Sequence, residues 1–448
     1  MRYCHFPFRH IYVDFMGQIR LCGWNNGAPV GYITDGLEKV WHSEAANEVR
    51  RAILDGSFSR CRKNVCPHIM NNTLPEIEAS TLENLTYPFP DHFSLCYDYI
   101  CNLACPSCRK DFIYGSPRAQ EFFNNVYAEL KPHLNDLLFL DIGGHGDPIF
   151  SKHSLHLLEN LRPERANAQI IIETNGTLFT PAIWKKIEHL GAFNLTVIVS
   201  VESLNPYVYA KLRRGGNFDA LHKNLRFMSE LRQKGLIKKL NAVMVVQELN
   251  FMEMPLFAKY CTDLHFDGVD FENLYSWGTF TEKEYFFKNL LNPSHPQNEF
   301  FKELLAEVKK DKRVRCWAGD TNRNASRCVV IGASQCAVSE ITPEDTVDAH
   351  AKFSTLADAI YNREYIFVQK DGMYHGMLMY GDFQKQMGYA QCSSQSAEEL
   401  CNKGYTVISD KSISDIFAEK ETFINSCQYV FPIVYNGKLR AKLLIEKS

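Results

Sequence analysis

The sequence predicts an α/β protein organised around a parallel β-sheet. From about residue 91 to residue 310, short apolar runs alternate with segments of helical periodicity, which is typical of repeated βα units. The expected strands are residues 93–97, 137–142, 169–174, 195–201, 240–246 and 268–272. The expected helices include residues 117–133, 180–190, 217–234 and 252–263. A second observation is a cysteine-rich loop directly after the first of these strands.

Length and composition are those of a globular protein. The chain has 448 residues, which favours two to four domains with enough length to bury real cores. The formal net charge is -3, which implies no general attraction to nucleic acid or to an anionic membrane. Residues 1–5 carry no apolar signal-peptide core, and no run of about 18 apolar residues predicts a membrane span. We therefore expect a cytoplasmic protein without nucleic-acid or membrane partners, and its 15 cysteines favour metal ligation in a reducing compartment.

Three cysteines lie close together in the loop, at Cys101, Cys105 and Cys108. An iron–sulfur cluster is normally held by four thiolates, so a loop that supplies only three leaves one iron open to a small chelating ligand. A zinc site would require a fourth Cys or His at a suitable spacing nearby, and a disulfide suits an intracellular chain poorly. Three buried cysteines without any ligand are the remaining alternative. We favour the iron–sulfur interpretation.

The loop has the pattern Cys-x3-Cys-x2-Cys, begins with Cys-Asn-Leu-x-Cys and follows the apolar run at residues 93–95. In these features it resembles the loop of the radical S-adenosylmethionine (SAM) enzymes. The resemblance implies that the six βα units form a partial (β/α)6 barrel of TIM type. It also implies a [4Fe–4S] cluster on the three cysteines, with SAM bound at the open iron. In such barrels the working residues lie on loops at the carboxyl ends of the strands, which is where this loop is expected.

The resemblance extends to the end of the second expected strand. Residues 143–148, Gly-Gly-His-Gly-Asp-Pro, are similar to the Gly-Gly-Glu-Pro loop whose backbone receives the SAM amino group. It implies that Gly143 and Gly144 bind the cofactor through a bare backbone, which glycine allows to approach closely. Asp147 stands where the family has Glu, which is acceptable if the backbone makes the contact.

Further cofactor-binding residues are implied at the ends of the third and fourth strands. By resemblance, Thr174 and Asn175 face the cofactor or substrate cavity, Ser200 contacts the ribose hydroxyls, and Arg213 binds the SAM carboxylate. The guanidinium suits this role because it donates two parallel hydrogen bonds to a carboxylate. The simpler alternatives are an ordinary Asn-Gly turn at Asn175 and a solvated basic turn at Arg213.

Residues 1–70 contain four other cysteines, Cys4, Cys22, Cys61 and Cys66. Residues 11–22 alternate around a Gly turn and predict a β-hairpin, and residues 38–54 predict a helix. This segment resembles the SPASM domain, an auxiliary-cluster module of many radical SAM enzymes, although that module usually follows the barrel and often has more cysteines. Four thiolates complete one [4Fe–4S] cluster with no open iron, which is the second cluster we expect. A Cys4 zinc site is the alternative, because spacing alone does not separate the two.

The last third of the chain predicts an α+β domain with an internal repeat, since residues 365–383 and 430–444 share a strand–turn–strand pattern. The two segments resemble a pair of CBS motifs, a regulatory module that often binds adenine nucleotides. The resemblance places Asp382 at the ribose-binding position, although Met379 replaces the usual Thr and the second segment has no such Asp. It implies one adenine-nucleotide site at most, and a purely structural appendage is the alternative.

These patterns divide the chain into a SPASM-like module at residues 1–70, a linker at 71–90, the barrel at 91–310 and a CBS-like domain at 311–448. The resemblances imply an oxidoreductase-type or transferase-type radical enzyme that reductively cleaves SAM to a 5′-deoxyadenosyl radical. The radical would abstract hydrogen from a peptide or small-metabolite substrate, assisted by the auxiliary cluster. A flavodoxin or ferredoxin is the expected reducing partner. The alternative is a non-catalytic iron–sulfur protein that senses nucleotide.

Overall fold

The computed structural model describes residues 2–22, 29–63, 66–76, 89–275, 279–293, 295–316, 336–341, 345–351, 365–379, 396–397, 407–409, 430–435 and 438–445. Contacts divide the chain into two compact units, Met1–Tyr275 with Phe287–Ser326, and Ser276–Phe286 with Arg327–Ser448. Within the described ranges, no helix has both the length and the apolar character that a membrane span requires.

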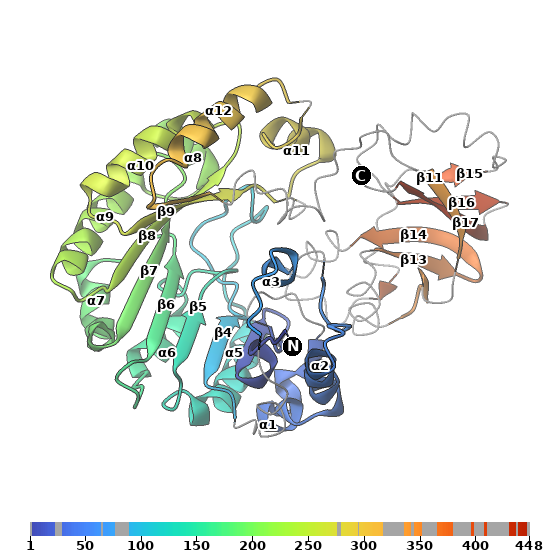
Figure 1. Cartoon of the computed structure of the whole chain (residues 1–448), viewed down its shortest axis with the longest axis horizontal. Coiled ribbons are helices and arrows are strands. Elements are labelled where there is room, and N and C mark those ends of the chain that lie inside the picture. The colour runs from blue at the N-terminus through green and yellow to red at the C-terminus, as the bar shows by residue number, and fades with distance from the viewer. Residues whose placement is uncertain are drawn as a thin grey trace. The chain divides into compact units, whose positions relative to one another are not determined.

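The first unit is built on a ten-stranded sheet in the order β10-β9-β8-β7-β6-β5-β4-β1-β2-β3 (Figure 1). Neighbouring strands from β10 to β1 are parallel, and the pairings of β1 with β2 and of β2 with β3 are antiparallel. The strands are β1 (His10–Asp14), β2 (Gln18–Arg20), β3 (Pro29–Tyr32), β4 (His92–Cys96), β5 (Phe139–Ile142), β6 (Gln169–Thr174), β7 (Asn194–Ser200), β8 (Lys239–Val246), β9 (Gly268–Asn273) and β10 (Val314–Cys316).

The six strands expected from the sequence are confirmed as β4 to β9, and β10 adds one more parallel strand at the edge. The helices between them are α5 (Pro117–Leu130), α6 (Lys152–Asn160), α7 (Pro181–Ile187), α8 (Pro206–Leu212), α9 (Phe218–Gln233) and α10 (Met254–Asp263), followed by α11 (Glu282–Lys288) and α12 (Asn298–Val308). Figure 1 shows α6, α7, α9 and α10 along one side of the sheet. α6 and α8 lie outside the helices that were named from the sequence. Their starts are fixed by the side chains of Ser151 and Asn205, which accept hydrogen bonds from backbone N–H groups of the first turn.

The predicted N-terminal hairpin is confirmed as β1 and β2, and it extends the barrel sheet. β1 pairs in parallel with β4 along its whole length, from His10 opposite His92 to Asp14 opposite Cys96. The predicted helix at residues 38–54 is two helices, α1 (Leu37–Trp41) and α2 (Glu44–Leu54), because Ser43 caps a new helix by accepting from the Ala46 N–H. A short helix, α3 (Pro67–Met70), follows. Apolar residues of β1 and α2 belong to the same buried core as the barrel strands.

The second unit contains two small sheets with a shared local arrangement. A three-stranded sheet joins β12 (Thr346–Asp348) in parallel to a hairpin of β13 (Tyr365–Lys370) and β14 (Met373–Met379). A four-stranded sheet joins β15 (Ile408–Ser409) in parallel to a hairpin of β16 (Val430–Tyr435) and β17 (Lys438–Ile445), with β11 (Cys336–Glu340) on the far side. Both hairpins shift register after their fourth residue, at Val368 and Ile433. The strand–turn–strand repeat is therefore confirmed, whereas Asp382 lies outside the described residues.

Packing of α10 against the sheet gives a test of the core. Phe257 is fully buried and contacts Phe271 of β9, whereas its neighbour Leu256 is 60% exposed. Phe257→Ala should lower the free energy of unfolding by about 3–5 kcal/mol, because it removes a buried ring and leaves a cavity. Leu256→Ala is the matched control and should stay within about 0.5 kcal/mol in the same urea titration. Equal losses in the two variants would contradict this packing.

His10 at the start of β1 predicts a pH-dependent loss of stability. It is 2% exposed, neither ring nitrogen has a hydrogen-bond partner among the described residues, and burial lowers its pKa from 6.5 to about 3. Below pH 6.5 the unfolded chain therefore binds a proton that the folded chain excludes, which costs up to about 1.4 kcal/mol per pH unit. His10→Phe removes this cost in unfolding free energy, because Phe cannot be protonated. A phenyl ring also suits the aromatic contacts with Phe6 and Phe139. Between pH 7 and pH 4.5 the variant should lose less unfolding free energy than the wild type in urea titrations, and parallel losses would show that His10 is not the cause.

Candidate active site

The three cysteines of residues 101–108 follow the carboxyl end of β4. Cys101 and Cys105 are buried and Cys108 is exposed. The N–H of Cys108 donates to the carbonyl of Cys105 over 2.9 Å, which makes a tight turn between them. Because the carboxyl ends of parallel strands meet at one edge of a sheet, this turn lies beside the loops that follow β5, β6 and β7.

Each of the three sulfur atoms receives a hydrogen bond from a different side chain. Asn175 Nδ2 lies 3.7 Å from the Cys101 sulfur, and Arg213 Nη1 lies 3.6 Å from the Cys105 sulfur. Arg109 Nη2 lies 3.4 Å from the Cys108 sulfur. Two of the three donors are cationic, and such neighbours stabilise thiolates.

Burial and charge act in opposite directions on these thiols. Burial raises the pKa of Cys101 to about 12 and raises the pKa of Cys105. The positive charge of Arg109 opposes the rise at Cys101, and that of Arg213 opposes it at Cys105. A negatively charged group held by thiolates needs such compensation, so this donor set fits an iron–sulfur cluster. Among the described residues, no three His, Cys, Asp or Glu side chains form a group that could hold a single metal ion.

The glycines after β5 are required by the backbone around them. Gly143 has a φ of 143°, and a Cβ on it would lie 2.6 Å from the Cβ of Glu173 on β6. A Cβ on Gly146 would lie 2.6 Å from the carbonyl oxygens of Asp98 and Ile100. Since no side chain fits at these distances, the loop at residues 143–148 packs directly on β6 and on the segment that leads to the cysteines.

Asp147 is a structural anchor of this loop. Its carboxylate accepts from the backbone N–H groups of Ile149 and Phe150 at 3.0 Å and from that of Asn175 at 2.7 Å. It also accepts from the Thr174 hydroxyl at 2.9 Å. The hydrogen bonds from Thr174 and Asn175 fix the end of β6 against the loop.

Asn175 connects the end of β6 to the cysteine loop. Its Nδ2 donates to Asn102 Oδ1 at 2.9 Å, and its Oδ1 accepts from the N–H and the hydroxyl of Thr177. Asn102 in turn donates to the Thr177 hydroxyl at 2.9 Å. The amide groups thus form a closed polar network beside Cys101, which is more than an isolated Asn-Gly turn would provide.

Arg213 is held by a buried ion pair that the sequence analysis missed. Its Nη2 lies 2.5 Å from the carboxylate of Glu202, which also accepts from the Val245 N–H at 2.9 Å. Burial raises the pKa of Glu202, and the charge of Arg213 opposes the rise. Glu202 has a φ of 70°, a left-handed conformation that is uncommon for a side chain of this size. The solvated basic turn considered for Arg213 is therefore wrong, because this guanidinium is buried between Glu202 and Cys105.

Arg109 is a further residue of the candidate site. Its position next to Cys108 is the feature of the sequence that could have indicated it. Its guanidinium donates to the carbonyl of Tyr99 at 2.9 Å and to the carbonyl of His145. It thereby joins the cysteine loop to the glycine loop. Ser200 ends β7, is partly exposed and has no side-chain hydrogen bond within the described part of the chain.

The four N-terminal cysteines are gathered in the same unit. Burial raises the pKa of Cys4 to about 12, and the charges of Cys22, Cys61 and Cys66 raise it further. The pKa of Cys61 is likewise raised to about 12, first by burial and then by Cys22 and Cys66. The four cysteines therefore lie in one unit and influence one another electrostatically, but among the described residues their side chains do not form a group arranged to hold a metal ion.

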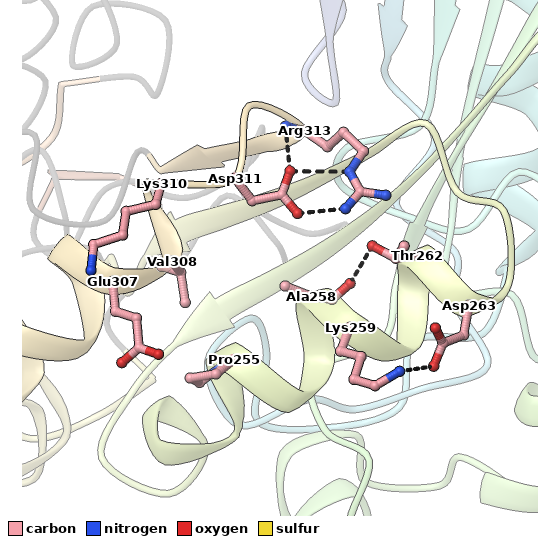
Figure 2. Close-up of a pocket in the computed structure, with 10 residues that line it drawn as sticks. All are labelled: Pro255, Ala258, Lys259, Thr262, Asp263, Glu307, Val308, Lys310, Asp311 and Arg313. Atoms are coloured by element: carbon pink, nitrogen blue, oxygen red, sulfur yellow. Dashed lines mark hydrogen bonds and ion pairs between the residues drawn. The ribbon is translucent and has the colours of Figure 1, made fainter.

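A hollow of about 590 Å³ lies between α10 and the segment after α12 (Figure 2). Four of its charged residues form local ion pairs, Lys259 with Asp263 and Arg313 with Asp311, each at 2.7 Å. The hollow is lined by α10, by the end of α12 and by the segment before β10, and by none of residues 101–108. We do not assign it to the active site.

The chain thus combines a large, mostly parallel sheet with a three-cysteine loop and a glycine loop after its strands. Residues 99–259 match the model of the Radical SAM superfamily, and residues 4–67 match that of SPASM, an iron–sulfur cluster-binding domain. These matches support a radical SAM enzyme with a SPASM domain, which implies [4Fe–4S] clusters and SAM as cofactors.

Solved structures give further comparisons. SuiB from Streptococcus suis bound to S-adenosylmethionine is 13% identical, with a TM-score of 0.37, and the match covers 83% of this chain and 77% of that chain. SuiB bound to precursor peptide SuiA is 13% identical, with a TM-score of 0.38 and the same coverage of 83% and 77%. The CBS-domain containing protein ATU1752 from Agrobacterium tumefaciens is 20% identical, with a TM-score of 0.19, and covers 22% of this chain and 81% of that chain. No curated protein matches this chain.

The ion pair at Arg213 predicts a large stability effect. Glu202→Gln should lower the free energy of unfolding by about 3–5 kcal/mol, because it leaves the buried guanidinium without its counter-ion. Asp263→Asn, which breaks the exposed pair with Lys259, should cost at most about 1 kcal/mol. Urea titrations of both variants and of the wild type measure these differences in the free energy of unfolding. A loss at Glu202 as small as that at Asp263 would contradict a buried, charged pair.

Proposed function

We propose that this chain is a radical SAM enzyme that cleaves SAM reductively at Cys101, Cys105 and Cys108 and removes hydrogen from a peptide or small-metabolite substrate. The observation that carries the proposal is the separate hydrogen-bond donor on each of the three sulfur atoms. Donors placed in this way suit thiolates that share one negatively charged cluster.

The cluster and SAM, when bound, supply reductive cleavage of the sulfonium to methionine and a 5′-deoxyadenosyl radical. The residues of this chain position the reactants and exclude water. The three cysteines would hold the cluster, and the backbone at Gly143 and Gly144 would receive the SAM amino group. Asn175 and Ser200 would face the cofactor from the ends of β6 and β7. Arg213, already anchored on Glu202, would direct its remaining N–H groups toward the SAM carboxylate and Cys105.

The N-terminal cysteines, Cys4, Cys22, Cys61 and Cys66, would hold a second [4Fe–4S] cluster. With four thiolates it has no open iron, so its role would be to accept or supply an electron. A flavodoxin or ferredoxin would be the reducing partner, and the protein would work in the cytoplasm. In the second unit, the repeated hairpins support a CBS-like pair, which would bind at most one adenine nucleotide. Calorimetry with ATP, ADP and AMP addresses that last point.

Anaerobic reconstitution tests the proposed function. Wild-type protein should bind about eight iron atoms per chain, four for each cluster, and should form 5′-deoxyadenosine from SAM after reduction with dithionite. Cys105→Ala should lose about four of these iron atoms and reduce 5′-deoxyadenosine to background. Cys261→Ala is the matched control, because this buried cysteine of α10 lies outside both proposed sites, and it should keep iron and turnover unchanged.

Three outcomes would contradict parts of this proposal. Wild-type turnover no higher than that of Cys105→Ala, with cell extract as a source of substrate, would favour the non-catalytic alternative. About four iron atoms per chain would remove the second cluster. Zinc in place of the missing iron would assign the N-terminal cysteines to a Cys4 zinc site.

A further inference from the structure

Two cationic side chains contact sulfur atoms of the three-cysteine loop. Arg213 Nη1 lies 3.6 Å from the Cys105 sulfur, and Arg109 Nη2 lies 3.4 Å from the Cys108 sulfur. The donor at the third sulfur atom is an uncharged amide. The positive charge that the protein supplies to a cluster at these sulfurs therefore depends on what else the two guanidinium groups contact.

Arg213 has its counter-ion within the protein. Its Nη2 lies 2.5 Å from one carboxylate oxygen of Glu202, and the other oxygen accepts from the Val245 N–H at 2.9 Å. Opposite charges this close largely cancel at distances longer than the pair itself. Arg213 thus gives Cys105 a hydrogen bond but little net positive charge.

Arg109 differs from Arg213 because its partners are neutral. In the part of the chain that the structure describes, its side-chain hydrogen bonds go to the Cys108 sulfur, to the Tyr99 carbonyl at 2.9 Å and to the His145 carbonyl, and none goes to a carboxylate. Carbonyl oxygens orient the guanidinium but leave its unit charge uncancelled. A partly buried cation normally requires an anion, because desolvation makes an isolated charge costly.

The anions that act on Arg109 are the cysteines themselves. Burial alone would lower the pKa of Arg109, but the charges of Cys108, Cys101 and Cys105 raise it above its ordinary value. Arg109 in turn opposes the rise in the pKa of Cys101 that burial causes. A negatively charged group held by the three thiolates would therefore supply the missing counter-charge.

The fold holds Arg109 from two segments. Tyr99 lies between β4 and the cysteines, and His145 lies in the glycine loop after β5. A Cβ on Gly146 would lie 2.6 Å from the Ile100 carbonyl oxygen, so the two segments are in direct contact. The planar guanidinium bridges segments that are already packed together, and this fixes its charge beside the Cys108 sulfur.

We propose that Arg109 is a positioning residue that raises the reduction potential of a cluster at residues 101–108, by holding an uncompensated positive charge on the Cys108 sulfur. This role rests on the proposed function, which requires one-electron reduction of that cluster before SAM is cleaved. In the reduction, a flavodoxin or ferredoxin loses one electron and the cluster gains it, with no bond formed or broken. The site becomes more negative by one charge, and a neighbouring cation stabilises that reduced state.

Redox titration followed by electron paramagnetic resonance tests the charge of Arg109 in the anaerobically reconstituted full-length chain. The signal that is missing from Cys105→Ala identifies the cluster at residues 101–108. Arg109→Gln should make its one-electron reduction at least tenfold less favourable, which is a shift of about 59 mV to lower potential. Arg109→Lys keeps the charge on a different side chain and should stay within threefold of the wild type.

Arg214→Gln is the matched control for the loss of one positive charge. Arg214 is exposed and donates to the Lys110 carbonyl rather than to a sulfur atom. Solvent and salt screen an exposed charge, so this variant should change the reduction equilibrium less than twofold. Arg109→Met is a second neutral variant, and it should show the same shift as Arg109→Gln.

Several results would overturn the role of Arg109. These are neutral variants with the potential of the wild type, a shift in Arg109→Lys as large as in Arg109→Gln, or an equal shift in Arg214→Gln. Iron analysis adds one more. Loss of about four iron atoms in both neutral variants, with full iron in Arg109→Lys, would assign Arg109 to cluster assembly instead of to the potential.

The titration needs no SAM, so its outcome is separate from that of the proposed function. The expected shifts without 5′-deoxyadenosine formation would refute the radical SAM activity and leave the role of Arg109 standing. Formation of 5′-deoxyadenosine with unshifted potentials would do the reverse. Iron content and resonance signal in Cys105→Ala equal to those of the wild type would place no cluster at residues 101–108 and overturn both.

Discussion

Parallel pairing of β4, β5, β6 and β7 is the constraint on which the candidate active site depends. The sheet brings four strand ends to one edge, where the chain has to turn and expose backbone and polar side chains. The cysteine loop is then held by hydrogen bonds from the loops of other strands, through Asn175 after β6 and Arg213 after α8. Arg109 adds the link to the glycine loop after β5. A shift of β4 relative to β6 and β7 would therefore disturb the environments of Cys101 and Cys105 together.

Charge compensation within the fold explains the two buried carboxylates of the candidate active site. Glu202 and Arg213 satisfy each other, and Asp147 is surrounded by donors from the backbone and from Thr174. Both carboxylates can be explained by the fold alone.

The sequence was sufficient for what depends on local pattern. The six parallel strands, the hairpin at residues 11–22 and the clustering of Cys101, Cys105 and Cys108 follow from periodicity and spacing. It was insufficient where a role depends on which strands become neighbours. Nothing near Glu202 in the sequence indicates that Arg213 will fold back on it. The break between α1 and α2 also escaped, because the apolar period continues across Ser43 although its side chain caps a new helix.

The N-terminal hairpin has a geometric consequence for any second cluster. Cys4 precedes β1 and Cys22 follows β2, so both lie toward the amino end of β1. Residues 101–108 follow the carboxyl end of β4, which pairs with β1 along five positions from His10 to Asp14. At about 3.3 Å per residue, this strand pair alone separates the two ends by roughly 13 Å. A group on the N-terminal cysteines would therefore be too far away to share a ligand with the SAM site. Any coupling between them would have to pass through the sheet or by transfer of an electron.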